Sequence, residues 1–151
     1  MITLDERLKA CAKYVSGKGT VCDVGTDHAY LPAYLILSEK CRNAVAGDIN
    51  DGPLEFAEQT LNKYKLSDKI KLVKSDGLKN ISPENVSDVI IAGMGGETIS
   101  DILAEAEWLR NGVNLILQPM TRAQGLRKWL YKNGYEIISE RAVSHDRFNY
   151  T

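Results

Sequence analysis

Val21-Cys22-Asp23-Val24-Gly25-Thr26-Asp27-His28 is the stretch of the sequence that decides the fold. An apolar run leads into a glycine followed by acids, which predicts a buried strand that ends in a tight turn. One β–α unit later, Val45-Ala46-Gly47-Asp48 ends a second apolar run in a carboxylate. An acid at that place can accept hydrogen bonds from both hydroxyls of a ribose. The two stretches together predict a site for a nucleoside cofactor.

The charge of this predicted site separates two classes of cofactor. A dinucleotide carries an anionic pyrophosphate, which binds to the bare amides of a G-x-G-x-x-G loop. This chain instead places Asp23, Asp27 and Asp48 around the single glycine Gly25. These acids repel pyrophosphate but suit a cation, and S-adenosylmethionine carries a sulfonium, an ammonium and a ribose. Methyl transfer is therefore the leading hypothesis, and a dinucleotide-dependent oxidoreductase is the disfavoured alternative.

Strands and helices alternate along the chain. Apolar runs predict strands over 20–24, 43–48, 70–74, 86–92, 113–117 and 135–143, and helical spacing predicts helices over 4–15, 29–37, 51–64, 97–109 and 122–132. Thr3 and Glu6 have the spacing of a capping box at the start of the first helix. This order predicts a Rossmann-like α/β fold, a mostly parallel sheet with helices on both faces.

Polar and glycine residues follow the ends of four different predicted strands. They are Asp27, Asp48, Asp76 and Gly93. Ligands of open parallel sheets bind outside the carboxyl ends of the strands, near the point where the strand order reverses. We therefore expect these residues to share one edge of the sheet and to line one site.

Composition limits the class of protein. With 151 residues and 44% hydrophobic content, the chain is expected to form a single domain over 1–151. A formal net charge of −1 gives no overall signature of nucleic-acid binding. Cys11, Cys22 and Cys41 form no C-x-x-C pair and are expected to be reduced and buried, and two distant histidines provide no metal set. Without a signal peptide or a membrane-length apolar run, the expected location is the cytoplasm.

Four strings make the resemblance specific. They are Asp23-Val24-Gly25-Thr26-Asp27-His28-Ala29-Tyr30-Leu31-Pro32, Asp48-Ile49-Asn50-Asp51-Gly52-Pro53-Leu54, Ile91-Ala92-Gly93-Met94-Gly95-Gly96 and Leu115-Ile116-Leu117-Gln118-Pro119. In this order they closely resemble the TrmK family of bacterial tRNA (adenine-22-N1)-methyltransferases, a branch of the class I S-adenosylmethionine-dependent enzymes. The resemblance extends from the first helix to about Tyr150.

The resemblance implies an S-adenosylmethionine-binding domain, a tRNA substrate and no metal. The family has a mainly helical C-terminal extension that helps to engage tRNA, and we expect this extension to be absent here, so that this chain alone lacks that part of the tRNA-binding surface. Class I enzymes insert a last antiparallel strand between the fifth and the sixth, and Arg147-Phe148-Asn149-Tyr150 only begins it. The resemblance therefore implies that the last antiparallel strand is incomplete.

Cofactor contacts are expected at the strand ends. Asp48 is expected to bind the ribose hydroxyls, with Ile49 beside it. Asp76-Gly77 is expected to contact the adenine amino group, although Asp76 can instead be an ordinary turn aspartate. Gly25 and Asp23 are expected at the methionine end, with Asp27 and Gly93 completing the cofactor site. For each acid the structural alternative is an ordinary turn or helix cap.

The reaction chemistry assigns roles to Asp27, His28 and Tyr30. Adenine N1 has an in-plane lone pair, so it needs alignment and a nearby anion to balance the product charge rather than a strong base. Asp27 is the candidate anion, and Glu97 is a weaker one because it can equally be a first-turn helix acid. His28 is expected to position Asp27 or contact a ligand, and Tyr30 to stack on an extruded adenine. A structural histidine and a core tyrosine are the alternatives.

Two later strings are expected to contact the substrate base. Met94, Gly95 and Gly96 replace the Asp/Asn-Pro-Pro-aromatic string of exocyclic-amine methyltransferases, which argues against N6 chemistry, although a helix-entry loop is the alternative. Gln118 can hydrogen-bond the base, whereas Pro119 can simply end a strand. The helix predicted over 122–132 is basic, and its cations are expected either to bind phosphates or simply to face solvent. They are Arg122, Arg127, Lys128 and Lys132. A non-catalytic S-adenosylmethionine- or RNA-binding module remains a further alternative.

Overall fold

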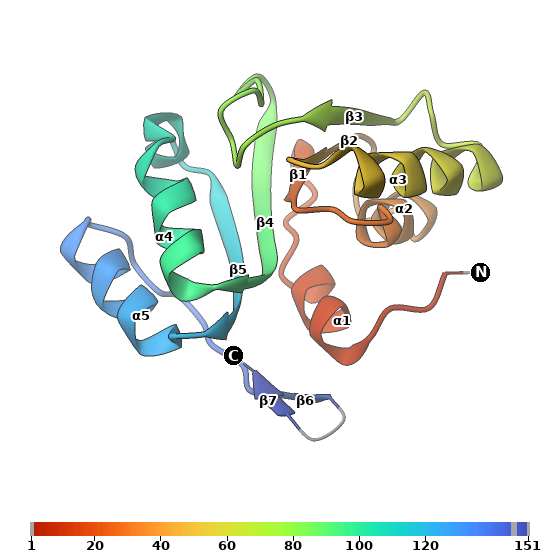
Figure 1. Cartoon of the computed structure of the whole chain (residues 1–151). Helices are drawn as coiled ribbons and strands as arrows, with labels where there is room; N and C mark the ends of the chain where they lie inside the picture. The colour runs from red at the N-terminus through yellow and green to blue at the C-terminus, as the bar shows by residue number, and fades with distance from the viewer. Residues whose placement is uncertain (1, 146–147, 151) are drawn as a thin grey trace.

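Five parallel strands form the centre of the molecule. The computed structural model describes residues 2–145 and 148–150, and Figure 1 shows their elements. The strands and helices, in chain order, are α1 (Glu6–Lys13), β1 (Thr20–Val24), α2 (Tyr30–Leu37), β2 (Ala44–Asp48), α3 (Asp51–Tyr64), β3 (Ile70–Lys74), β4 (Val86–Gly95), α4 (Gly96–Ala104), the 3-10 helix η1 (Glu107–Arg110), β5 (Asn114–Thr121), α5 (Ala123–Lys132), β6 (Val143–His145) and β7 (Phe148–Tyr150).

The strand order in the sheet is β3-β2-β1-β4-β5, and every pair in it is parallel. The order reverses between β1 and β4, and the general rule for open parallel sheets places a ligand crevice there, outside the carboxyl ends of the strands. The Rossmann-like α/β fold expected from the sequence is confirmed.

Helices cover both faces of the sheet (Figure 1). Alternate residues of β1 divide between the two cores: Val21 packs with α1, α2 and α3, whereas Cys22 and Val24 pack with α4 and α5. The three cysteines are buried free thiols. No helix in the described part of the chain has the length and apolar character needed to cross a membrane.

The start of α1 differs from the capping box expected at Thr3 and Glu6. Asp5 is the N-cap, and its Oδ1 accepts from the amide of Leu8 at 2.9 Å. Glu6 is then the first helical residue. The prediction was wrong because Asp5 is itself a strong cap and lies two residues closer to the apolar stripe.

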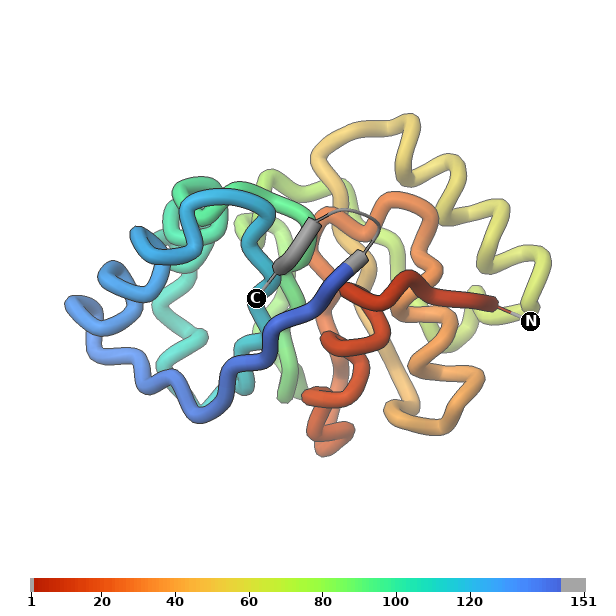
Figure 2. The backbone as a smooth tube through the Cα atoms, turned by 90° about the horizontal axis from the view of Figure 1, so that it is seen from below, coloured from red at the N-terminus to blue at the C-terminus, as the bar shows by residue number. Residues whose placement is uncertain are grey.

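The prediction of a strand over 135–143 was also wrong. Within this range only Val143 belongs to a strand, as the first residue of β6. Tyr135 is held at the end of α5, where its amide donates to Leu130 O and its ring stacks on Trp129. The segment after it crosses from α5 toward α1 (Figure 2) without joining the sheet. Polar side-chain contacts replace a ladder there, since Glu140 pairs with Arg127 at 2.6 Å.

The end of the chain forms a small separate sheet. β6 and β7 pair antiparallel, with Val143 opposite Tyr150. The last strand expected to begin at Arg147 is antiparallel over Phe148–Tyr150, but its partner is β6 rather than the main sheet. Asp146 and Arg147 lie outside the described residues.

Two predicted boundaries shift at the crevice. β4 continues through Gly93-Met94-Gly95 with breaks in register against β5, and β5 continues through Gln118-Pro119 to Thr121. The predicted helix over 97–109 divides into α4 and η1. The glycine string is thus the distorted end of a strand, and Gly96 begins the helix that follows.

Candidate active site

The turn after β1 is joined to the end of β2 by its backbone. The amides of Gly25 and Thr26 both donate to Gly47 O at 2.9 Å, and the amide of Asp27 donates to Asp48 Oδ2 at 3.3 Å. Asp27 and Ala29 both adopt left-handed backbone conformations, with φ of 56° and 59°. The predicted neighbours Gly25, Asp27 and Asp48 therefore lie side by side at the switch point.

Gly25 gives the turn its close approach to β4. Its φ is +72°, and an added Cβ would lie 2.5 Å from Cε of Met94. A side chain at this position would be strained by the backbone and would displace the Met94 methyl group. Met94, expected at the substrate base, thus lies against the Gly25 turn expected at the cofactor.

Asp48 ends β2 with a mostly buried carboxylate. Its Oδ1 accepts from the amide of Asn50 at 3.1 Å, and its Oδ2 accepts from the amide of Asp27. Each carboxylate oxygen retains acceptor capacity beyond these bonds. No lysine or arginine of the described residues pairs with Asp48, so its charge is available to hydroxyl donors. The adjacent Ile49 side chain is half exposed.

Asp23 lies beneath this turn and is almost fully buried. Burial raises the pKa of its carboxyl to about 7, an effect that the Thr26 hydroxyl opposes and the Asp48 carboxylate strengthens. Thr26 Oγ1 is itself buried and makes no hydrogen bond of good geometry within the described residues. A cationic group near Asp23 would stabilise its ionised form, and Thr26 has a polar atom left to satisfy.

Asp76 and Gly77 lie in the turn after β3. The Asp76 carboxylate pairs with Lys79 at 3.1 Å, and the buried Ser75 hydroxyl donates to Gly77 O at 2.9 Å. The amide of Ser75 donates to Asp48 O, which brings this turn to the same edge as β2. Asp76, which is expected to contact adenine, therefore also forms an ordinary ion pair that stabilises its turn.

His28 lies between two other rings. It stacks on Tyr30, with ring centroids 5.1 Å apart, and on Phe56, with centroids 4.7 Å apart. Its Nδ1 is 3.2 Å from Asp27 Oδ2, which forms an ion pair when the imidazole is protonated. The Asp27 side chain is otherwise mostly exposed, so His28 orients a solvent-accessible anion in the turn after β1.

The Gln118 side chain is buried, and both its oxygen and its nitrogen form hydrogen bonds. Its Oε1 accepts from Arg7 Nη1 at 2.8 Å and from the amide of Gly93 at 3.0 Å. Its Nε2 donates to Pro119 O at 3.1 Å. Gln118 therefore joins α1 to the ends of β4 and β5, and any contact with a base would have to share these bonds.

The remaining glycines of the β4 string contact the end of β5. Gly96 is buried against the backbone carbonyl of Arg122, where a Cβ would collide. A Cβ at Gly95 would lie 3.1 Å from Thr121 Oγ1. Close packing of α4 against β5 thus accounts for Gly96, while Gly93 and Met94 stay at the crevice.

The basic side chains expected near phosphates are partly neutralised. Arg127 pairs with Glu140, and Arg122 Nη1 is 3.5 Å from Glu97 Oε1. Lys128 and Lys132 remain exposed on α5. No group of three or more His, Cys, Asp or Glu side chains within the described residues is arranged to hold a metal ion.

Two residues of this region carry no assignment in the sequence analysis, Arg7 and Phe56. The residues of the Arg7–Gln118 hydrogen bond are 111 positions apart in the sequence, so no local pattern predicts it. Phe56 is 49% exposed on α3. An exposed aromatic residue on an amphipathic helix can indicate a binding surface, and this signal was present in the sequence.

Family comparison identifies the domain. Residues 4–151 match the model of the methyltransferase domain family. The chain belongs to this family. Within it, the resemblance to TrmK is confirmed: the tRNA (adenine(22)-N(1))-methyltransferase of Bacillus subtilis is 39% identical over 146 residues, which are 96% of this chain and 61% of that protein. The chain thus spans less than two thirds of the length of this curated relative.

Solved structures of the methyltransferase family agree with the fold. The crystal structure of the B. subtilis M1A22 tRNA methyltransferase TrmK has a TM-score of 0.94 and 38% identity, over 99% of this chain and 64% of that one. M. capricolum TrmK, in complex with the cofactor product S-adenosyl-homocysteine, has a TM-score of 0.88 and 34% identity, over 97% of this chain and 66% of that one.

Proposed function

We propose that the chain is the catalytic domain of an S-adenosylmethionine-dependent methyltransferase that modifies adenine N1 in tRNA. The observation that carries the proposal is the joining of Asp27 to Asp48 at the switch point of the sheet. The names of the TrmK relatives support the same reaction and the same class of substrate.

The residues present fit this cofactor. The Asp48 carboxylate suits the ribose hydroxyls, and the half-exposed Ile49 beside it suits an apolar face of the adenine ring. Asp76 and Gly77 are assigned to the adenine edge, and Gly93 to the crevice floor. The buried Asp23 and the unsatisfied Thr26 hydroxyl suit the ammonium end, because that group is both a cation and a hydrogen-bond donor.

The protein's role in transfer is alignment and charge balance. S-adenosylmethionine supplies an electrophilic methyl group, and positive charge passes to the adenine ring as N1 attacks. We assign Asp27 to stabilising that charge, because its carboxylate is exposed to the crevice and held by His28. Tyr30, stacked on His28, is assigned to the ring of the target base.

The β4 and β5 ends would form the other wall of the substrate site. Met94 and Gly95 are assigned to the base edge, whereas Gly96, Gln118 and Pro119 hold that wall in place through their contacts with Arg122, Arg7 and Gly93. This arrangement revises the direct role expected for Gln118 into one of positioning.

The test has two parts. Calorimetry should detect binding of S-adenosylmethionine and S-adenosyl-homocysteine to the folded chain, and methyl-labelled S-adenosylmethionine should transfer label to an unmodified tRNA transcript. A folded sample that binds neither nucleoside would refute the cofactor assignment. Binding without transfer would favour the non-catalytic module instead.

A further inference from the structure

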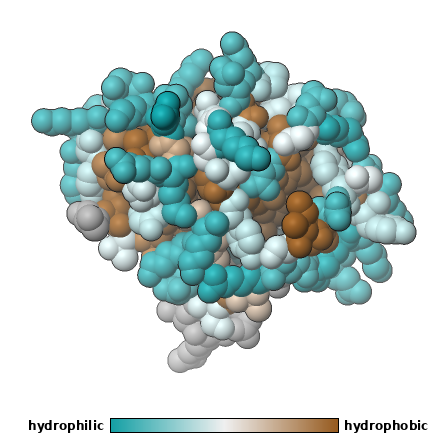
Figure 3. Space-filling model, turned by 180° about the vertical axis from the view of Figure 1, so that it is seen from behind, coloured by the Kyte–Doolittle hydropathy of each residue, from teal (hydrophilic) through white to brown (hydrophobic). Residues whose placement is uncertain are grey.

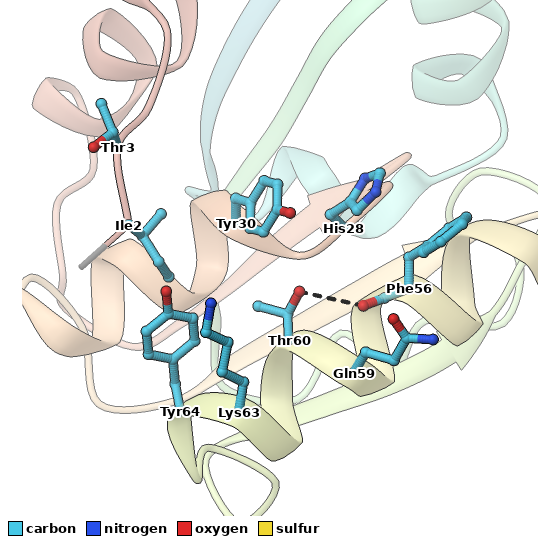
Figure 4. Close-up of a pocket in the computed structure, with 9 residues that line it drawn as sticks. All are labelled: Ile2, Thr3, His28, Tyr30, Phe56, Gln59, Thr60, Lys63 and Tyr64. Carbon is cyan, nitrogen blue, oxygen red and sulfur yellow. Dashed lines mark hydrogen bonds between the residues drawn. The ribbon is translucent and has the colours of Figure 1, made fainter.

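A pocket of about 320 Å³ adjoins the Asp27 turn on the face covered by α2 and α3. Figure 4 shows its residues, which come from the amino-terminal segment, the start of α2 and one face of α3. Phe56, Gln59, Thr60, Lys63 and Tyr64 recur at helical spacing, so a single face of α3 forms one wall. The volume lies at the lower end of the range for ligand pockets, about 300–1,000 Å³, and suits a single nucleotide rather than a duplex.

One end of this pocket is aromatic. Phe56 and Tyr30 are 49% and 45% exposed, although both stack on His28. Exposed aromatic faces next to a pocket are the usual platform for unpaired bases, because every base has a face that can stack. Gln59, also exposed, adds an amide that can donate to and accept from a base edge.

The other end is basic. Lys63 and Tyr64 lie there with Ile2, and the Lys63 ammonium points into the pocket toward Tyr30 (Figure 4). Within residues 2–145 and 148–150, no carboxylate pairs with Lys63, whose Nζ is 5.4 Å from the centroid of the Tyr64 ring. Lys74 and Lys79, which lie near β3, are by contrast engaged by Asp51 and Asp76. Lys63 is therefore a cation with its charge available to a phosphate.

Apolar side chains are also exposed elsewhere on the surface. Figure 3, the view from behind, shows apolar side chains exposed in hollows between hydrophilic ones. A larger pocket of about 550 Å³ lies between α1, β5, α5 and the segment after α5, and aliphatic, tyrosine, amide and charged side chains line it. The smaller pocket differs in its position, because its stacking faces, its amide and Lys63 lie beside the turn that holds Asp27.

We propose that this pocket binds a second nucleotide of the RNA, one that is not itself methylated, with its base on Phe56 and its phosphate at Lys63. The proposal rests on the proposed function, since it names a subsite for the same substrate. Because His28 contacts both Asp27 and Phe56, an occupied pocket would place the neighbouring nucleotide next to the anion assigned to transfer.

The test compares four variants with the unaltered chain, using an unmodified tRNA transcript as the probe. Phe56→Ala should weaken RNA binding about 10-fold and raise KM for RNA by a similar factor, because one stacking contact is lost. Lys63→Ala should lower the slope of log Kd against log salt by about one, and Lys63→Arg should restore it. Lys18→Ala, an exposed lysine at the opposite edge of the sheet, is the matched control.

The possible outcomes distinguish a failure of the pocket proposal from a failure of the proposed function. If the chain methylates RNA while both variants bind RNA like Lys18→Ala, the pocket proposal is wrong and the proposed function stands. If Phe56→Ala and Lys63→Ala lose RNA binding but the unaltered chain transfers no methyl group, the pocket stands and the reaction is wrong. A loss confined to kcat would place the methylated base itself in the pocket, and no RNA binding at low salt would also refute the proposal.

Discussion

The backbone amide of Asp27 donates to the Asp48 carboxylate at 3.3 Å, which links the turn after β1 to the end of β2. The residue assigned to the product charge and the residue assigned to the ribose therefore keep a fixed separation. One amide hydrogen bond contributes about 1 kcal/mol, so the link orients the two acids rather than stabilising the fold as a whole.

Asp48→Asn should weaken binding of S-adenosylmethionine about 10- to 100-fold, because hydrogen bonds to a charged acceptor are replaced by weaker ones. Asp51→Asn is the matched control, since Asp51 is an exposed acid three residues away that pairs with Lys74. Calorimetry on both variants checks the assignment, and equal losses in the two would count against a specific ribose contact.

Asp27→Asn should slow methyl transfer about 100-fold while cofactor affinity changes by less than about threefold. Asparagine tolerates the left-handed conformation that Asp27 adopts, so the turn is preserved. Single-turnover kinetics with labelled cofactor measures the rate of transfer apart from binding. Full activity in this variant would remove Asp27 from the mechanism.

Asp23 should make stability fall as pH rises. Its pKa is about 7 in the folded protein against 3.8 for an ordinary aspartate, so between these values the folded state holds a proton that the unfolded state has lost. The free energy of unfolding should therefore decline from about pH 4 to pH 7, by up to about 1.4 kcal/mol per pH unit, and then level off. Urea unfolding of the cofactor-free chain and of Asp23→Asn, from pH 5 to pH 8, isolates the effect. Parallel curves for the two proteins would contradict it.

Asp88 should matter for stability alone. It is fully buried at the amino end of β4, where its carboxylate accepts from Ser16 N at 2.9 Å, Ser16 Oγ at 2.8 Å, Ser87 Oγ at 2.7 Å and Asn114 Nδ2 at 2.8 Å. Burial raises its pKa, but these donors outweigh burial and hold the pKa below the usual value. Its contribution should be present above about pH 4 and be lost as pH falls below that value.

Asp88→Ala should therefore lower the free energy of unfolding by roughly 2–4 kcal/mol at pH 7, because several donors lose their acceptor. Urea unfolding and cofactor calorimetry together measure the two effects. Since Asp88 lies at the edge opposite the site, a folded variant with impaired cofactor affinity would show that the two edges are coupled.

Arg7→Ala should slow transfer about 10-fold with little change in cofactor affinity, because Gln118 would lose the donor that fixes it against Gly93. Lys9→Ala, an exposed residue of the same helix, provides the control. If the Arg7 and Lys9 variants had equal rates, Gln118 would not need Arg7 for its position.

The sequence predicted the elements that have strong local patterns. Val21–Val24 is a buried apolar run before a glycine, and β1 and the turn follow it closely. The prediction of a strand after Tyr135 was wrong because the apolar residues there have no strand to pair with, and Ile138 is in fact 88% exposed. The contact of Arg7 with Gln118 was not predictable, since it depends on packing between distant elements. Strand ends meet at one edge by topology, which is why Asp27, Asp48 and Asp76 were predictable as residues of neighbouring turns.

Mass-spectrometric mapping of the methylated nucleoside tests the central claim most directly. The chain, S-adenosylmethionine and an unmodified tRNA transcript are incubated together, and the RNA is then digested to nucleosides. We expect N1-methyladenosine, in an amount reduced about 100-fold for Asp27→Asn. N6-methyladenosine, or no methylated nucleoside from a folded chain that binds the cofactor, would contradict it.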